Sequence, residues 1–163
     1  MANVVACSIV CSRLNYCNSI LYSITAHNID RLQRVQNSLA RVVCRAPYRS
    51  SAILLRQSLH WLPIEARITF KIAMLTYKLW NHRQSAYLSS MIIDYKPARF
   101  LRSAVSDLLV IPRTKTVTAS RAFRIAALKA WNSLPATVRS SNSINGFRRQ
   151  LKTHLFNLAY NWL

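Results

Sequence analysis

The sequence is nearly without acidic residues and glycine. Of its 163 residues only four are Asp or Glu, against 23 Lys and Arg, and only one is Gly. The acids are Asp30, Glu65, Asp94 and Asp107, and the two closest are thirteen positions apart. Polymerases and metal-dependent nucleases hold two metal ions with clustered carboxylates. This scarcity argues against such chemistry, and a single glycine excludes a glycine-rich phosphate loop.

The cysteines lack the spacing of a metal site or of a disulfide framework. Cys7, Cys11, Cys17 and Cys44 are four, six and twenty-seven residues apart, which matches neither paired CxxC ligands nor a small secreted scaffold. We expect reduced, buried thiols that pack like small apolar side chains. The four histidines are scattered and share no motif with them. We therefore predict no enzyme activity, no metal site and no cofactor for this chain.

Long apolar runs are missing as well. No segment reaches the eighteen or so consecutive apolar residues typical of a membrane-spanning helix. The first twelve residues lack the basic stretch with which a signal peptide begins. We interpret the start of the chain as the interior of a helix that belongs to a longer protein.

The residues that are present suit a basic globular domain. Apolar residues make up 52% of the chain and include four Trp, enough to fill a core at this length. We expect a single helical domain over residues 1–163. The net charge of +19 and a pI near 11.1 favour a polyanionic partner.

Helices are predicted over most of the chain. Residues 4–24 contain no Pro or Gly, and Ile29, Leu32 and Leu39 follow the spacing of one helix face. These segments predict a helical hairpin over 1–45. Pro63 suits the first turn of a helix, so we expect helices over 51–93 and two more over 120–163. The fold class is therefore all-α, an irregular bundle of about six helices.

The segment 94–119 departs from this helical pattern. Pro97 and Pro112 bracket a basic stretch, and LLVIP followed by KTVTA places β-branched residues around a turn at Arg113 and Thr114. We expect a basic arm here, or a small β-hairpin around 108–118.

Four arginines recur on one side of the second predicted helix. Arg31, Arg34, Arg41 and Arg45 fall opposite the apolar face at about 100° per residue. Guanidinium groups bind phosphates bidentately, and few acids are present to pair with them. Two interpretations stay open, namely a surface that follows a phosphate backbone and a solvated helix face.

A second basic cluster lies in the 94–119 segment and contains an aromatic ring. Its members are Lys96, Arg99, Phe100, Arg102, Arg113 and Lys115. Single-stranded nucleic acids are commonly bound by rings that stack on bases next to cations. The other interpretation is a basic surface loop that Phe100 and Leu101 anchor to the core.

Five phrases in fixed order resemble one family. They are SRLNYCNSILYS (12–23), DRLQRVQNSLARVV (30–43), LHWLPIEARITFKI (59–72), KAWNSLP (129–135) and FRRQLKTHLF (147–156). Their order and wording resemble the segment that follows the polymerase core in reverse transcriptases of non-LTR retrotransposons (LINEs) of the chicken-repeat and jockey type. Asn15 departs from the family pattern, which has Asp there, and this puts in doubt a salt bridge or cap made at that place in relatives.

The resemblance implies a non-catalytic fragment that follows the polymerase thumb. It would help to hold the RNA template or the nicked target DNA during target-primed reverse transcription, with the polymerase and endonuclease residues upstream. The implied partners are nucleic acid and an upstream polymerase domain, and an intracellular, nuclear location is compatible with the family. Two alternatives stay open: a decayed transposon remnant without activity, and a helical module that docks on a protein or a membrane surface.

Overall fold

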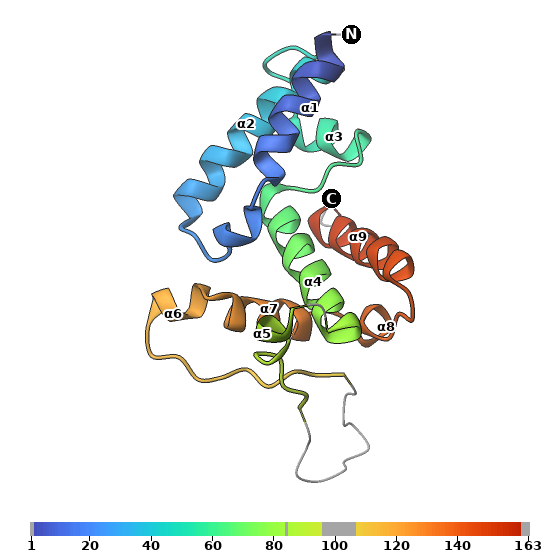
Figure 1. Ribbon diagram of the computed structural model, residues 1–163. Coiled ribbons are helices and arrows are strands. Elements are labelled where there is room, and N and C mark those ends of the chain that lie inside the picture. Colours follow the sequence, from blue (N-terminus) through green and yellow to red (C-terminus); the bar gives the residue numbers. More distant parts are fainter. Residues whose placement is uncertain (1, 84, 96–106, 161–163) are drawn as a thin grey trace. The chain divides into compact units, whose positions relative to one another are not determined.

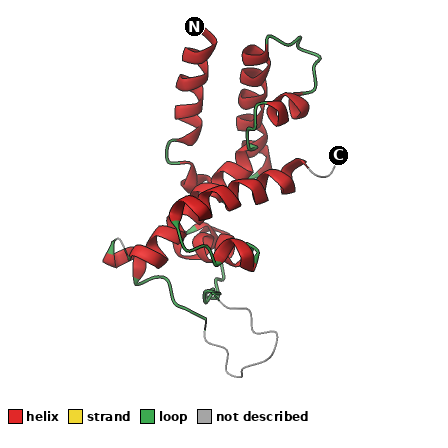
Figure 2. Cartoon of the chain, turned by 90° about the vertical axis from the view of Figure 1, so that its right-hand side faces the viewer, coloured by secondary structure: helices red, strands yellow, loops and turns green. Residues whose placement is uncertain are grey.

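The structure is a computed structural model that describes residues 2–83, 85–95 and 107–160. These residues are mostly helical and form nine α-helices and one 3-10 helix, with no strand among them (Figure 2). This confirms the predicted all-α class, although the helices are shorter and more numerous than expected. None of the described helices is long and apolar enough to cross a bilayer.

The chain divides into two compact units. Unit 1 comprises Met1–Ile68 and Thr153–Leu163, and unit 2 comprises Thr69–Lys152. Two long helices, α4 (Ile64–His82) and α9 (Ile144–Tyr160), each contribute residues to both units. The single domain over 1–163 stays a prediction.

Unit 1 begins with three helices. α1 (Ala2–Asn15) and α2 (Ala26–Cys44) run antiparallel, and α3 (Ala52–Ser58) lies beside α2 (Figure 1). The first helix ends well before residue 24, although residues 4–24 contain no Pro or Gly, because Cys17 adopts a left-handed conformation with φ of 48°. A left-handed residue ends the hydrogen-bond ladder of a helix. The chain then forms only the short 3-10 helix η1 (Asn18–Leu21) before α2.

Two glutamines of α2 hold the start of α4. Gln36 is fully buried, and its Nε2 donates to the Leu62 carbonyl at 2.9 Å. Gln33 Nε2 donates to Gln36 Oε1 at 2.8 Å, while Gln33 Oε1 accepts from the backbone N–H of Ile64 at 3.0 Å. The first N–H groups of a helix lack partners within the helix. Gln33 therefore caps α4 from a neighbouring helix.

The LHWLP phrase is held against the end of α9 within unit 1. The Tyr160 hydroxyl donates to the Trp61 carbonyl, and the His60 ring stacks on Phe156 with centroids 5.7 Å apart. Burial raises the pKa of Tyr160 above its ordinary value. Arg67 also contacts this turn, with Cζ 5.8 Å from the centroid of the Trp61 ring.

Trp131 lies at the centre of the core of unit 2. It is 0% exposed, and its ring centroid lies 5.4 Å from that of Trp80, 5.7 Å from Phe147 and 6.4 Å from Tyr77. The sequence predicts three tryptophans in the core. Trp131 is fully buried, whereas Trp80 and Trp61 are half-buried. The shorter helices of this unit are α5 (Ala86–Ser89), α6 (Val117–Arg121), α7 (Phe123–Asn132) and α8 (Ala136–Arg139).

The β-hairpin predicted around 108–118 is not formed. Leu109 makes an isolated antiparallel bridge with Asp94 instead. The Asn132 side chain bonds both backbone groups of Leu109, accepting from its N–H at 2.9 Å and donating to its carbonyl at 2.8 Å. Those groups are therefore unavailable for pairing with the later residues. The Thr116 side chain caps α6, which occupies the segment predicted as the second strand.

Several turns place residues other than glycine in the left-handed region. The described residues with positive φ are Cys17, Ser23, Arg45, His60, Arg83, Ser85 and Asp107. This conformation costs an L-residue about 1–2 kcal/mol. Gly146 has no positive φ and lies in the first turn of α9, where its N–H donates to Ser143 Oγ at 3.1 Å. The one glycine therefore does not occupy any of the described positions at which a positive φ would favour glycine.

All four cysteines are free. Cys17 is exposed and the other three are half-buried, so the prediction of buried thiols is wrong. The Sγ atoms of Cys7 and Cys11, one turn apart on α1, are 3.8 Å apart, and burial raises the pKa of Cys7. Within residues 2–83, 85–95 and 107–160, no three His, Cys, Asp or Glu side chains gather as metal ligands.

Candidate nucleic-acid interface

The outer face of α2 carries Arg31, Arg34 and Arg41, and Arg45 follows as the residue that ends the helix in a left-handed conformation, with φ of 50°. We call these four residues the arginine stripe. At about 100° per residue the three helical members fall within an arc of about 80°. The buried residues of the same helix are Gln36, Leu39 and Ala40, which lie on the other side. The helix is therefore fixed by one face and presents the arginine stripe on the opposite one.

The arginine stripe is accessible and has no acidic partner. Arg31, Arg34 and Arg45 are exposed, and Arg41 is half-buried. No ion pair joins any of the four to an acid among the described residues, although Asp30 lies in the same helix. From Arg31 to Arg45 the stripe extends for about 21 Å, which equals about six phosphates of one strand of a duplex.

The loop after α2 holds Arg41 in place. Its Nε and Nη2 donate to the Ser50 carbonyl at 3.4 Å and 3.3 Å, and its Cζ lies 5.3 Å from the centroid of the Tyr48 ring. Tyr48 itself is 87% exposed. We call Arg41 and Tyr48 the Arg–Tyr platform, because a guanidinium and an open ring stand together in a fixed arrangement. Such a pair can bind a phosphate and stack on a base.

A hollow of about 380 Å³ connects the platform with the arginine stripe. Ser38, Arg41, Val42, Arg45, Ala46 and Tyr48 line it. Two of these residues, Arg41 and Arg45, were predicted from the sequence, whereas Tyr48 was not. The sequence does contain a signal for Tyr48, because this aromatic residue lies between two basic residues, Arg45 and Arg49, in a short loop that contains Pro47.

Two apolar residues beside the arginine stripe are exposed. The three-and-four pattern of α2 includes Val35 and Val42, but they are 48% and 52% exposed. The buried face is rotated so that Gln36 points inward instead, where it bonds the Leu62 carbonyl. The two valines therefore add apolar contact area at the edge of the arginine stripe.

The second predicted cluster lies only partly in the described part of the chain. Lys96, Arg99, Phe100 and Arg102 fall outside the described residues. Arg113 and Lys115 are described and exposed, and they belong to unit 2. The structure thus brings the arginines of α2 together, whereas the basic arm with its stacking ring stays a prediction.

The guanidinium groups of the arginine stripe and the ring of Tyr48 determine which ligands this interface can bind. It can neutralise anionic groups spaced along a backbone and stack on flat rings. None of the four acids lines the hollow. Comparison of the chain with protein families, with curated proteins and with solved structures found no match.

Proposed function

We propose that this chain is a non-catalytic domain that binds the backbone of nucleic acids with little dependence on sequence. The arginine stripe carries the proposal, because it sets four guanidinium groups along about 21 Å of α2 and the residue that ends it. None of them has an acidic partner among the described residues. A net charge of +19 adds long-range attraction for a polyanion.

The Arg–Tyr platform favours single strands over duplexes. Every unpaired base has a flat face that can stack on a ring, whereas the bases of a duplex are already stacked. Tyr48 is exposed and has Arg41 beside it, so a stacked base would lie next to a cation for its phosphate.

The family resemblance supports the same function. We propose that the chain corresponds to the region downstream of the polymerase core in a LINE-type reverse transcriptase. There it would hold the RNA template or the nicked target DNA for an upstream polymerase domain. The phrase DRLQRVQNSLARVV supplies Arg31, Arg34 and Arg41, three of the four arginines of the stripe.

Salt dependence of binding tests the proposal. Four phosphate contacts to a single strand predict a slope of about −3 in log affinity against log salt, so affinity should fall about 50-fold over a fourfold rise in salt. We would measure fluorescence anisotropy of labelled single-stranded RNA and DNA, with circular dichroism in parallel. Neutral and anionic vesicles serve as the comparison.

The possible results separate the alternatives. A helical, cooperatively melting chain that binds no strand would contradict the proposal, and tight binding to anionic vesicles alone would favour a membrane-surface module. A chain without helical structure would favour a decayed remnant.

Substitution Tyr48→Ala is expected to weaken binding to single strands by about 5- to 150-fold, because one stacked base contributes about 1–3 kcal/mol. Tyr48→Phe should retain most of the affinity, since it keeps the ring. Tyr87→Ala removes another exposed tyrosine, in unit 2, and is the matched control. Equal losses for single strands and duplexes would count against stacking on Tyr48.

A further inference from the structure

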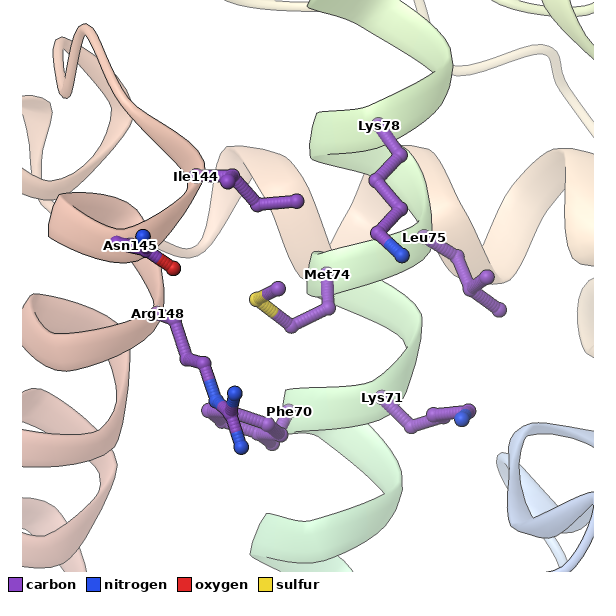
Figure 3. Close-up of a pocket in the computed structure, with 8 residues that line it drawn as sticks. All are labelled: Phe70, Lys71, Met74, Leu75, Lys78, Ile144, Asn145 and Arg148. Atoms are coloured by element: carbon purple, nitrogen blue, oxygen red, sulfur yellow. The ribbon is translucent and has the colours of Figure 1, made fainter. Parts of the chain in front are cut away.

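Unit 2 contains a hollow of about 280 Å³ that no pattern in the sequence predicts. It lies between α4 and the first turns of α9, and we call it the α4 hollow (Figure 3). Its apolar lining comes from Phe70, Met74 and Leu75 of α4 and Ile144 of α9, all of which are half-buried. Figure 3 shows Met74 pointing from α4 toward α9.

Three cations surround this apolar lining. Lys71, Lys78 and Arg148 are exposed, and none of their side chains makes a hydrogen bond or ion pair with another described residue. The acids of unit 2 are Asp94 and Asp107, and neither lines the hollow. The α4 hollow therefore combines an apolar centre with uncompensated positive charge.

The order of residues along α4 resembles the order of groups along a single strand. Lys71 and Lys78 are two turns apart, about 10.5 Å along the helix axis, and Met74 and Leu75 lie between them. Arg148 extends from α9 toward Phe70 of α4 (Figure 3). Each cation could contact a phosphate of the strand, and the apolar surface between the cations could contact the base that lies between those phosphates.

We propose that the α4 hollow takes one unstacked base of a single strand, with its flanking phosphates on Lys71, Lys78 and Arg148. This inference rests on the proposed function and deepens it, because it adds a second contact site for the single strand and names the group that would occupy it. A base within a duplex is paired and stacked, so it cannot enter the hollow. The flexible stems of both lysines let their ammonium groups reach either phosphate.

The size of the hollow favours a base over a peptide helix. An amphipathic helix needs a groove that accepts side chains at i, i+3 or i+4, and i+7. The α4 hollow has about 280 Å³, near the lower limit of roughly 300 Å³ for small-ligand pockets. It accommodates one flat group, and its two ends carry the charge that the neighbouring phosphates require.

Methyl NMR of the full chain tests the occupant directly. With ¹³C-labelled methionine methyl groups, we would titrate the chain with hexauridylate, with inorganic phosphate and with an acidic helical peptide. We expect the Met74 signal to shift with hexauridylate while the Met91 signal stays in place. An equal shift with phosphate would indicate a simple anion site, and a shift with the peptide alone would indicate a protein partner. Either result would overturn the inference.

Paired substitutions separate this site from the arginine stripe. Lys71→Gln with Lys78→Gln should weaken hexauridylate binding about tenfold or more, given the strength of charge-assisted contacts. The control is Arg124→Gln with Lys129→Gln, which removes the same charge from exposed positions of α7 outside the hollow. If only arginine-stripe variants lose binding and Met74 does not respond, the α4 hollow is refuted and the proposed function stands. If Met74 responds but stripe variants bind normally, the α4 hollow stands and the assignment of binding to the arginine stripe is refuted.

Discussion

Trp131→Ala is expected to lower the melting temperature of the chain by about 6–20 °C, because removing a buried Trp costs about 3–5 kcal/mol. Trp131 is 0% exposed and touches the rings of Tyr77, Trp80 and Phe147. Its Nε1 also donates to the Asp107 carbonyl at 2.7 Å, which would lose its partner. This loss is a large fraction of the roughly 5–15 kcal/mol that stabilises a typical domain.

Thermal melting by circular dichroism measures this loss, and limited proteolysis locates it. New cleavage sites should appear within unit 2, residues 69–152. Trp131→Phe keeps an aromatic ring but no N–H, so it should cost clearly less than Trp131→Ala. Trp61→Ala affects a half-buried residue of unit 1 and should also cost less. A melting curve unchanged by Trp131→Ala would refute the assignment of this residue as the centre of the core.

Reversing the charge of Arg31 and Arg34 to Glu should weaken nucleic-acid binding by at least about 100-fold, since two charge-assisted contacts contribute about 1.5–3 kcal/mol each. Both side chains are exposed and make no hydrogen bond or ion pair with a described residue. The fold should therefore tolerate the change. Fluorescence anisotropy should also show the salt slope becoming shallower by about 1.4.

The matched control for this reversal is Arg121→Glu with Arg124→Glu. These arginines are exposed and lie on α6 and α7 of unit 2, so the net charge changes equally without touching the arginine stripe. If both double variants lose the same affinity, net charge and not the stripe determines binding. If Arg31→Glu with Arg34→Glu lowers the helical signal, these arginines are structural.

Helix positions with strong local signals could be predicted from the sequence. Pro63 directly precedes α4, as its preference for the first turn of a helix indicates. The end of α2 at Cys44 lies next to the predicted end of the helical hairpin at residue 45. In each case the signal is carried by residues within a few positions of the helix end, so no distant contact is needed.

Features that depend on distant partners could not be predicted. Gln36 is buried in place of the more apolar Val35, because the carbonyl of Leu62 and the side chain of Gln33 satisfy its amide. Leu109 was expected to pair with later residues, yet Asn132 takes both its backbone groups. Neither partner can be identified from spacing alone.

In the candidate site, too, features with local signals could be predicted from the sequence and features that depend on distant contacts could not. The spacing of Arg31, Arg34 and Arg41 follows from helix periodicity, and the structure places these three on one face of α2. Arg45 was predicted to continue that face, but it ends the helix in a left-handed conformation. The role of Tyr48 depends on how the loop after α2 folds back over Arg41. The α4 hollow requires two helices more than sixty residues apart in sequence, about which periodicity says nothing.

The left-handed turns also bear on how much mutation this protein tolerates. Ser23, Arg83 and Ser85 adopt positive φ and lie outside both the arginine stripe and the lining of the α4 hollow. Glycine fits that backbone without the Cβ clash, so these positions can be stabilised without changing either surface. A background with glycine substituted at these positions would have a larger stability margin above the folding threshold. Mutational scans of the arginines and of the α4 hollow carried out in it would then report on recognition more than on unfolding.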